Sequence, residues 1–266
     1  MTSRPLLFGV IDGYASEGGF DVAGGIATCY APAVGLGRVA SPGNGDDLWS
    51  NYAAIFRAAQ EIGLDGVSLT VEWARVAPRY DTVDHAAWGR YREMLSSARE
   101  TGLEVSVTVI GEVWPAWLGQ EAWLLPWVED EFAAHVERLM NTLGDLVSSV
   151  RLFSRDLATD GFLYGVIPPW RTRAREDARD AAAAIARMSE QAASRSDVAS
   201  KLRRTKDVLA QLPESVWSTV LARQEEFDEI HIATLLPGDG PTALGASLLR
   251  RGEGGYVGQL PTTLRR

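Results

Sequence analysis

The sequence contains a single cysteine, Cys29, and only three histidines among 266 residues. One thiol cannot form an internal disulfide or a cysteine-based metal cluster, so we expect a reducing compartment. Cys29 lies in a stretch rich in glycine and alanine and has no histidine nearby in sequence. This setting favours a small packed residue over a catalytic nucleophile.

The chain also lacks an excess of positive charge and any long apolar run. Its formal net charge is −9, with 35 acidic against 26 basic residues, whereas nucleic-acid binding requires a clustered basic surface. The basic runs at 171–179 and 203–206 are interleaved with acids and helix formers, which is typical of a solvated helix face. The apolar run within 1–8 is too short for a signal peptide or a membrane span. We therefore expect a cytoplasmic protein with a small-molecule substrate, no nucleic-acid or membrane partner, and an open oligomeric state.

The sequence contains a short pattern that occurs three times. A glycine, a strand-like apolar run and an acidic residue recur in 63–73, 102–112 and 144–156. The glycines stand 39 and 42 residues apart, which suits one helix, one strand and two short connections. The strand runs are almost continuously apolar or Ser/Thr, as in parallel strands that are covered on both faces. A helix is predicted before each of the three glycines, because apolar residues at steps of three and four fall on one helix face. They are Leu48, Tyr52, Ile55, Phe56 and Ala59, then Trp88, Tyr91, Leu95 and Ala98, then Phe132, Val136, Leu139 and Leu143.

This pattern predicts a single α/β domain over 1–266 that resembles a (β/α)8 TIM barrel, shortened or irregular in its second half. Six or seven strands can be read in total. The segment 171–226 is rich in helix formers, with helices expected up to 195 and over 196–211. A short strand is read over 216–221, a clearer strand over 227–236, a further helix over 241–251 and a last strand over 256–260. The segment 24–45, rich in Gly, Ala and Pro, is expected to be a long loop over the rim.

Acidic residues stand where the first four predicted strands end. Asp12, Glu72, Glu112 and Asp156 would meet at one rim, because the carboxyl ends of parallel strands share an edge. Crowded carboxylates raise at least one pKa toward the range useful for proton transfer. The alternative is that some of these acids pair with Arg75 and Arg155 and form a structural ion network.

Several segments resemble one known family in order and at the right spacing. They are Leu7-Phe8-Gly9 followed by Glu17-Gly18-Gly19, Val71-Glu72-Trp73-Ala74-Arg75-Val76 with Pro78, and Gly102-Leu103-Glu104-Val105 with Pro115. Over about 6–173 the chain resembles the family 1 glycoside hydrolases, the β-glucosidase-like (β/α)8 barrels. The resemblance implies a barrel with a sugar-binding pocket, a function in carbohydrate metabolism and no cofactor.

The chain differs from this family at the motifs that carry the family's catalytic and sugar-binding residues. The family ends its fourth strand with Asn-Glu-Pro, whose Glu is the acid/base, whereas this chain has Ser154-Arg155-Asp156. The family ends its third strand with a sugar-binding His-Trp pair, and the corresponding place in this chain reads Gly111-Glu112 or Glu112-Val113. The Glu-Asn-Gly motif that carries the family's nucleophile does not occur here. Retaining glycosidases need two carboxyl groups about 5 Å apart. Ordinary β-glucosidase activity is therefore not expected.

Two functional hypotheses remain open. The first is a repurposed glycosidase-like enzyme that performs acid/base isomerisation, cyclisation, elimination or hydrolysis on a small polar metabolite or glycoside. The second is a pseudo-glycosidase, a non-catalytic protein that binds a sugar or a partner. No metal is assigned, although carboxylates with one histidine can hold Mg²⁺ or Mn²⁺. The candidate catalytic residues are Glu72, Glu112 and Asp156, and the candidate substrate-binding residues are Asp12, Glu17, Trp73, Arg75, Trp114, Arg155 and His231.

Overall fold

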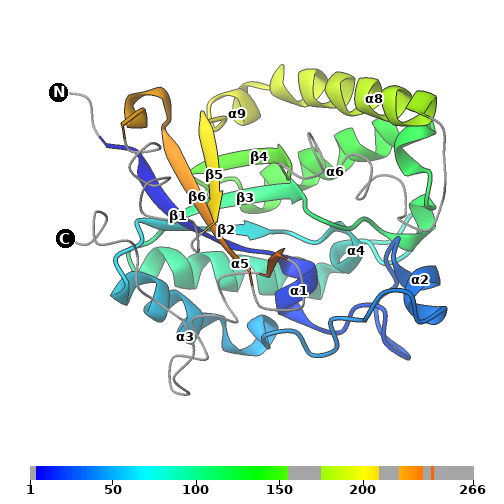
Figure 1. The fold of residues 1–266 in the computed structure, drawn as a ribbon, viewed down its shortest axis with the longest axis horizontal. Helices are drawn as coiled ribbons and strands as arrows, with labels where there is room; N and C mark the ends of the chain where they lie inside the picture. Colours follow the sequence, from blue (N-terminus) through cyan, green and yellow to red (C-terminus); the bar gives the residue numbers. More distant parts are fainter. Residues whose placement is uncertain (1–3, 155–174, 210–221, 236–240, 243–266) are drawn as a thin grey trace.

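A computed structural model describes residues 4–154, 175–209, 222–235 and 241–242. Its central feature is a curved sheet of six parallel strands (Figure 1), joined in the order β4-β3-β2-β1-β6-β5. The strands are β1 (Leu6–Ile11), β2 (Gly66–Thr70), β3 (Glu104–Ile110), β4 (Ser149–Phe153), β5 (Thr205–Leu209) and β6 (Glu229–Leu235). A short strand, β7 (Pro241–Thr242), pairs with β6 in the antiparallel sense.

The two outer strands, β4 and β5, are bridged across the open side of the sheet. The backbone N–H of Val150 donates to the carbonyl of Lys201 at 3.0 Å. The guanidinium of Arg151 pairs with the carboxylate of Asp207 at 2.8 Å. Because β6 pairs with β1, the strands follow one another in chain order around a barrel-like curve. The predicted α/β barrel-type fold is thus confirmed, with six parallel strands in the described residues.

Three long helices cover the outer face of the sheet (Figure 1). They are α3 (Leu48–Glu61), α5 (His85–Glu100) and α6 (Trp127–Leu143), and each buries the apolar stripe that its sequence spacing predicts. The carboxylate of Asp84 caps α5 by accepting the N–H of Ala87 at 2.9 Å. After α5 the chain turns at Gly102, whose φ of +85° favours glycine, and enters β3.

The other helices and turns, including the long helix α8 (Arg175–Ala193), complete the described structure. The segment 24–45, expected to be a loop, contains a short helix. Among the described residues, no helix combines the length and apolarity needed to cross a bilayer. The remaining helices are α1 (Gly13–Glu17), α2 (Ala31–Gly35), α4 (Trp73–Val76), α8 (Arg175–Ala193) and α9 (Ser196–Ala199), with 3₁₀ turns η1 (Ala116–Leu118), η2 (Ala122–Leu124) and η4 (Gln224–Glu226).

The two faces of the sheet differ in polarity. Val67 and Leu69 of β2 alternate with Ser68 and Thr70, and β3 repeats this pattern in register. Since successive side chains of a strand point to opposite faces, the aliphatic set packs under the helices and the hydroxyl set lines the concave side. The outer face therefore carries the hydrophobic core, and the inner face is polar.

The second half of the chain differs from its predicted elements. The helix expected over 196–211 is instead the short α9 followed by β5. Helix-forming residues in this segment are overridden by the backbone ladder between β5 and β6, which local propensity does not include. Pro241 and Thr242, expected in a helix, form β7. The strand read over 216–221 and the one over 256–260 lie outside the described residues.

Candidate active site

Three of the four predicted acidic residues follow neighbouring strands at one edge of the sheet. Asp12 comes directly after β1, and Glu72 and Glu112 each come two residues after β2 and β3. The ends of β1 and β3 lie close together, since a Cβ placed on Gly111 would be 3.3 Å from Oδ2 of Asp12. Asp156 and Arg155 lie outside the described residues.

Glu72 occupies the most buried position of this rim and has no exposed surface. Its Oε1 accepts the backbone N–H of Tyr14 at 2.9 Å, and its Oε2 has no hydrogen-bond partner among the described residues. Gly13 permits this approach, because a Cβ there would lie 2.5 Å from Cγ of Glu72. Burial, with the charges of Asp12 and Glu17, raises the pKa of Glu72 well above its usual value. The neutral form of Glu72 is therefore favoured more than in an exposed glutamate.

Glu17 and Arg75 form a buried ion pair beside Glu72. Nε of Arg75 lies 2.6 Å from Oε2 of Glu17, and its terminal nitrogen donates to the carbonyl of Gly18 at 2.6 Å. The hydroxyl of Tyr91 donates to the other oxygen of Glu17 at 2.7 Å. Burial raises the pKa of Glu17 to about 7, although Arg75 and Tyr91 oppose this rise. Arg75 therefore pairs with Glu17, which was not among the four strand-end acids considered as its partners.

Asp12 and Glu112 are the more accessible carboxylates. Asp12 is partly exposed, and one of its oxygens caps α1 by accepting the N–H of Ala15 at 2.9 Å. Glu112 is exposed, and the hydroxyl of Tyr30 lies 3.4 Å from its Oε1. Among the described acids of the rim, Glu112 is therefore the one best placed to meet a substrate.

Tyrosine hydroxyls are a component of the site that the sequence interpretation missed. Tyr14 donates to Asp21 at 3.0 Å, which also accepts from the hydroxyl of Thr28 at 2.6 Å. These bonds tie the segment before α2 to the rim, and Tyr30 extends from the same segment. Tyr91 belongs to the apolar stripe of α5, so periodicity alone marked it only as a core residue. The position of Tyr14, two residues after Asp12, was an available signal.

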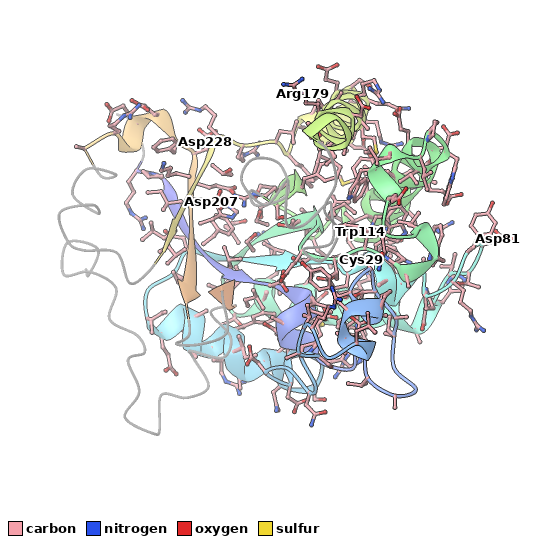
Figure 2. All side chains as sticks on the ribbon, turned by 45° about the vertical axis from the view of Figure 1, so that its right-hand side comes forward. Cys29, Asp81, Trp114, Arg179, Asp207 and Asp228 are labelled. Atoms are coloured by element: carbon pink, nitrogen blue, oxygen red, sulfur yellow. The ribbon has the colours of Figure 1, made fainter. Side chains whose placement is uncertain are left out.

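The two tryptophans predicted to bind substrate are buried instead. Trp73 is 3% exposed and stacks on His135 of α6, with ring centroids 4.6 Å apart, so it faces the helix layer. Trp114 is 1% exposed, and its indole N–H donates to the carbonyl of Gly119 at 2.7 Å. Figure 2 shows Trp114 beside Cys29 in the interior, where their backbones share a 2.9 Å hydrogen bond. Neither indole is open to a ligand at the rim in this structure.

His231 is also separated from the acidic rim. Its Nε2 lies 2.8 Å from the carboxylate of Glu229, and its ring stacks on Phe8 at 5.3 Å. Burial lowers the pKa of His231, and the nearby Arg151 adds to this effect. No group of three or more His, Cys, Asp or Glu side chains within the described ranges is arranged to hold a metal ion. His231 therefore belongs to a polar cluster inside the sheet.

Comparison with known proteins shows which proteins this chain is similar to. No protein-family model matches the chain. It is 26% identical over 166 residues to Beta-glucosidase 21 of Oryza sativa subsp. japonica, a stretch covering 59% of this chain and 32% of that protein. It is 25% identical over 150 residues to the Beta-galactosidase of Sulfolobus acidocaldarius, covering 40% and 30% of the two chains.

Solved structures show the same relation at the level of the fold. The β-glycosidase from Pyrococcus horikoshii superposes with a TM-score of 0.64 at 17% identity, over 85% of this chain and 54% of the other. The family 1 β-glucosidase from Thermotoga maritima has a TM-score of 0.64 at 18% identity, with the same coverage. The chain is a distant homologue of the family 1 glycoside hydrolases, and it spans about half the length of these two structures.

Proposed function

We propose that this protein is a glycoside-hydrolase-like enzyme that uses rim carboxylates for acid/base chemistry on a small polar metabolite or glycoside. The observation that carries the proposal is the burial of Glu17 and Glu72 beside Asp12: burial, with a smaller contribution from the neighbouring acids, raises the pKa of both glutamates. Carboxyl groups whose environments push their pKa values apart are typical of acid/base sites. Reaction class and substrate are left open within this proposal.

Within the proposal, Glu112 transfers the proton. It is the exposed acid of the described rim, and the hydroxyl of Tyr30 is close enough to orient it. Glu72 lies beneath, and its raised pKa favours the neutral form of its carboxyl, which would limit the negative charge beside Asp12 and Glu112. Asp12, which is partly exposed at the same rim, would lie beside a polar substrate.

A non-catalytic binding protein is the second candidate. It is favoured by one specific observation: the two carboxyl groups with raised pKa values, Glu17 and Glu72, are both buried. General acid/base work requires a group within hydrogen-bond reach of the substrate. If Glu112 serves only to hold a ligand, the rim would bind without turnover.

The experiment that separates the two candidates begins with the bound molecule. The protein is purified from its own host, and co-purifying small molecules are identified by native mass spectrometry. The identified compound is then incubated with the wild type and with Glu112→Gln, which keeps the size of the side chain and removes its charge. Conversion by the wild type that is lost in the variant supports the enzyme. Unchanged compound after prolonged incubation with the wild type favours the binding protein.

A further inference from the structure

A cavity lies on the flank of the molecule, outside the sheet and on the other side of α4 from the acidic rim. It has a volume of about 230 Å³ and lies between α6, α4 and the connection that follows α4. Its lining includes Trp73, Asp81, Trp117, Glu131, His135 and Arg138. Figure 2 shows Asp81 at the periphery, far from the interior position of Trp114 and Cys29. None of the chemistry proposed for the rim uses this cavity.

One face of α6 supplies much of the lining. Trp127, Glu131, His135 and Arg138 are spaced by three or four residues, so they share one side of the helix. Trp127 is 42% exposed, and its ring stacks on Trp117 with centroids 6.3 Å apart. A second exposed ring, Tyr80, contacts Trp117 at 5.6 Å. The cavity is therefore bordered by two exposed aromatic rings that contact Trp117.

His135 provides an unused hydrogen-bond acceptor in the cavity wall. The residue is buried and stacked on Trp73, and it hydrogen-bonds to the backbone of Val109. Its Nε2 has no partner among the described residues. Burial lowers the pKa of His135 to about 3, and the charge of Arg138 adds to this, so the ring is neutral at physiological pH. A neutral imidazole that donates through one nitrogen accepts through the other.

The lining matches the chemistry of a sugar ring. Asp81 and Glu131 offer acceptors, whereas Arg138 and Thr82 offer donors, so both hydrogen-bonding roles of a hydroxyl group can be satisfied. Trp117 and its neighbours offer flat apolar surface for the C–H face of a pyranose. Drug-sized ligands need cavities of roughly 300 to 1,000 Å³, so about 230 Å³ suits a single ring.

We propose that this flank cavity is a non-catalytic binding site for a neutral monosaccharide unit. It stands independently of the function proposed for the rim. Glu72 and Trp73 are adjacent in the chain, but the carboxyl of Glu72 meets Tyr14 at the rim and the indole of Trp73 meets His135 under α6. The two sites are thus back to back across α4, and one can bind while the other is altered.

The test follows the indole N–H signals of ¹⁵N-labelled protein during titration with methyl β-D-glucopyranoside, with Trp117→Phe used to assign the Trp117 signal. We expect saturable shifts of the Trp117 signal with a dissociation constant in the millimolar range or below. Glu131→Gln and Arg138→Met should each weaken binding about fivefold to tenfold. Both residues lie at the surface of α6, and dispersed indole signals in the apo variants will show that they fold.

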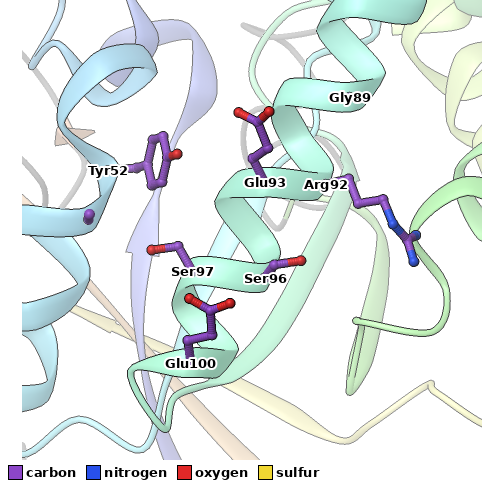
Figure 3. Close-up of a pocket in the computed structure, with 8 residues that line it drawn as sticks. Tyr52, Gly89, Arg92, Glu93, Ser96, Ser97 and Glu100 are labelled. Carbon is purple, nitrogen blue, oxygen red and sulfur yellow. The ribbon is translucent and has the colours of Figure 1, made fainter.

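Two matched controls should bind like the wild type. Glu93→Gln makes the same chemical change as Glu131→Gln in a different place, the groove between α3 and α5 shown in Figure 3. Glu112→Gln alters the rim only. The proposal is overturned if the shifts do not saturate up to about 100 mM glucoside, because so large a dissociation constant would mean almost no specific binding. It is equally overturned if Glu112→Gln abolishes binding while both α6 variants keep it, or if adenosine, a planar probe, shifts Trp117 and the glucoside does not.

Discussion

The buried side chain of His135 in α6 should make the free energy of unfolding depend on pH. In the folded state the pKa of His135 is lowered to about 3 from an ordinary value of 6.5, chiefly by burial. Below pH 6.5 the unfolded chain binds a proton that the folded chain refuses, so stability falls as the pH falls toward 3. At pH 4 the loss spans about 2.5 pKa units, or about 3 kcal/mol at roughly 1.4 kcal/mol per unit.

The substitution that isolates this effect is His135→Phe, which keeps a flat ring over Trp73 and cannot be protonated. Losing the hydrogen bond to Val109 should cost about 1 kcal/mol at every pH. We expect urea unfolding to show the variant less stable at pH 8 and more stable than the wild type at pH 4. A second variant, Arg138→Met, should recover part of the acid loss. A difference between wild type and His135→Phe that stays constant from pH 8 to pH 4 would refute the reasoning.

Three further predictions concern the rim. Glu112→Gln should lower turnover of the co-purifying substrate by about 10² to 10⁴ with little change in its affinity, measured by steady-state kinetics and calorimetry; an unchanged rate would remove Glu112 from proton transfer. Hydrolysis of p-nitrophenyl β-D-glucoside should be negligible, because the family's acid/base and nucleophile motifs do not occur in this chain. A rate of roughly 1 per second or more would show that other carboxyl groups of the chain form a working catalytic pair. Arg75→Met should destabilise the fold by about 3 to 5 kcal/mol in urea unfolding, because it leaves Glu17 buried without its ion partner. Adding Glu17→Gln should restore much of that loss, and a double variant no better than Arg75→Met would argue against the buried charge as the cause.

The cation–π contacts of Arg75 are relevant to the last experiment. Its guanidinium lies 4.4 Å from the ring centroid of Phe20 and 4.2 Å from that of Trp49. These contacts are each worth about 0.5 to 2 kcal/mol, so the double variant should not recover the full stability of the wild type. The shortfall between the double variant and the wild type would measure the aromatic contribution separately from the ion pair.

Much of the fold could be predicted from the amino-acid sequence, because periodicity records which face of each element is buried. The glycine-to-glycine spacing predicted the βα units, and the stripes of α3, α5 and α6 predicted the helix layer. Parallel strands place their carboxyl ends at one edge, so the sequence also placed Asp12, Glu72 and Glu112 together. The resemblance to family 1 glycoside hydrolases was readable from short motifs and is borne out by the comparisons.

The protonation and accessibility of the rim were decided only by the tertiary structure. A strand-end position fixes where a side chain starts, whereas its pKa depends on the water that neighbouring elements exclude, as the burial of Glu72 shows. The pairing of Arg75 with Glu17 joins residues 58 positions apart, and no local pattern specifies it. Trp73 turns outward because α6 presents His135 to it. β5 is a strand because β6 offers it a hydrogen-bonding edge, and that edge exists only once the sheet has formed.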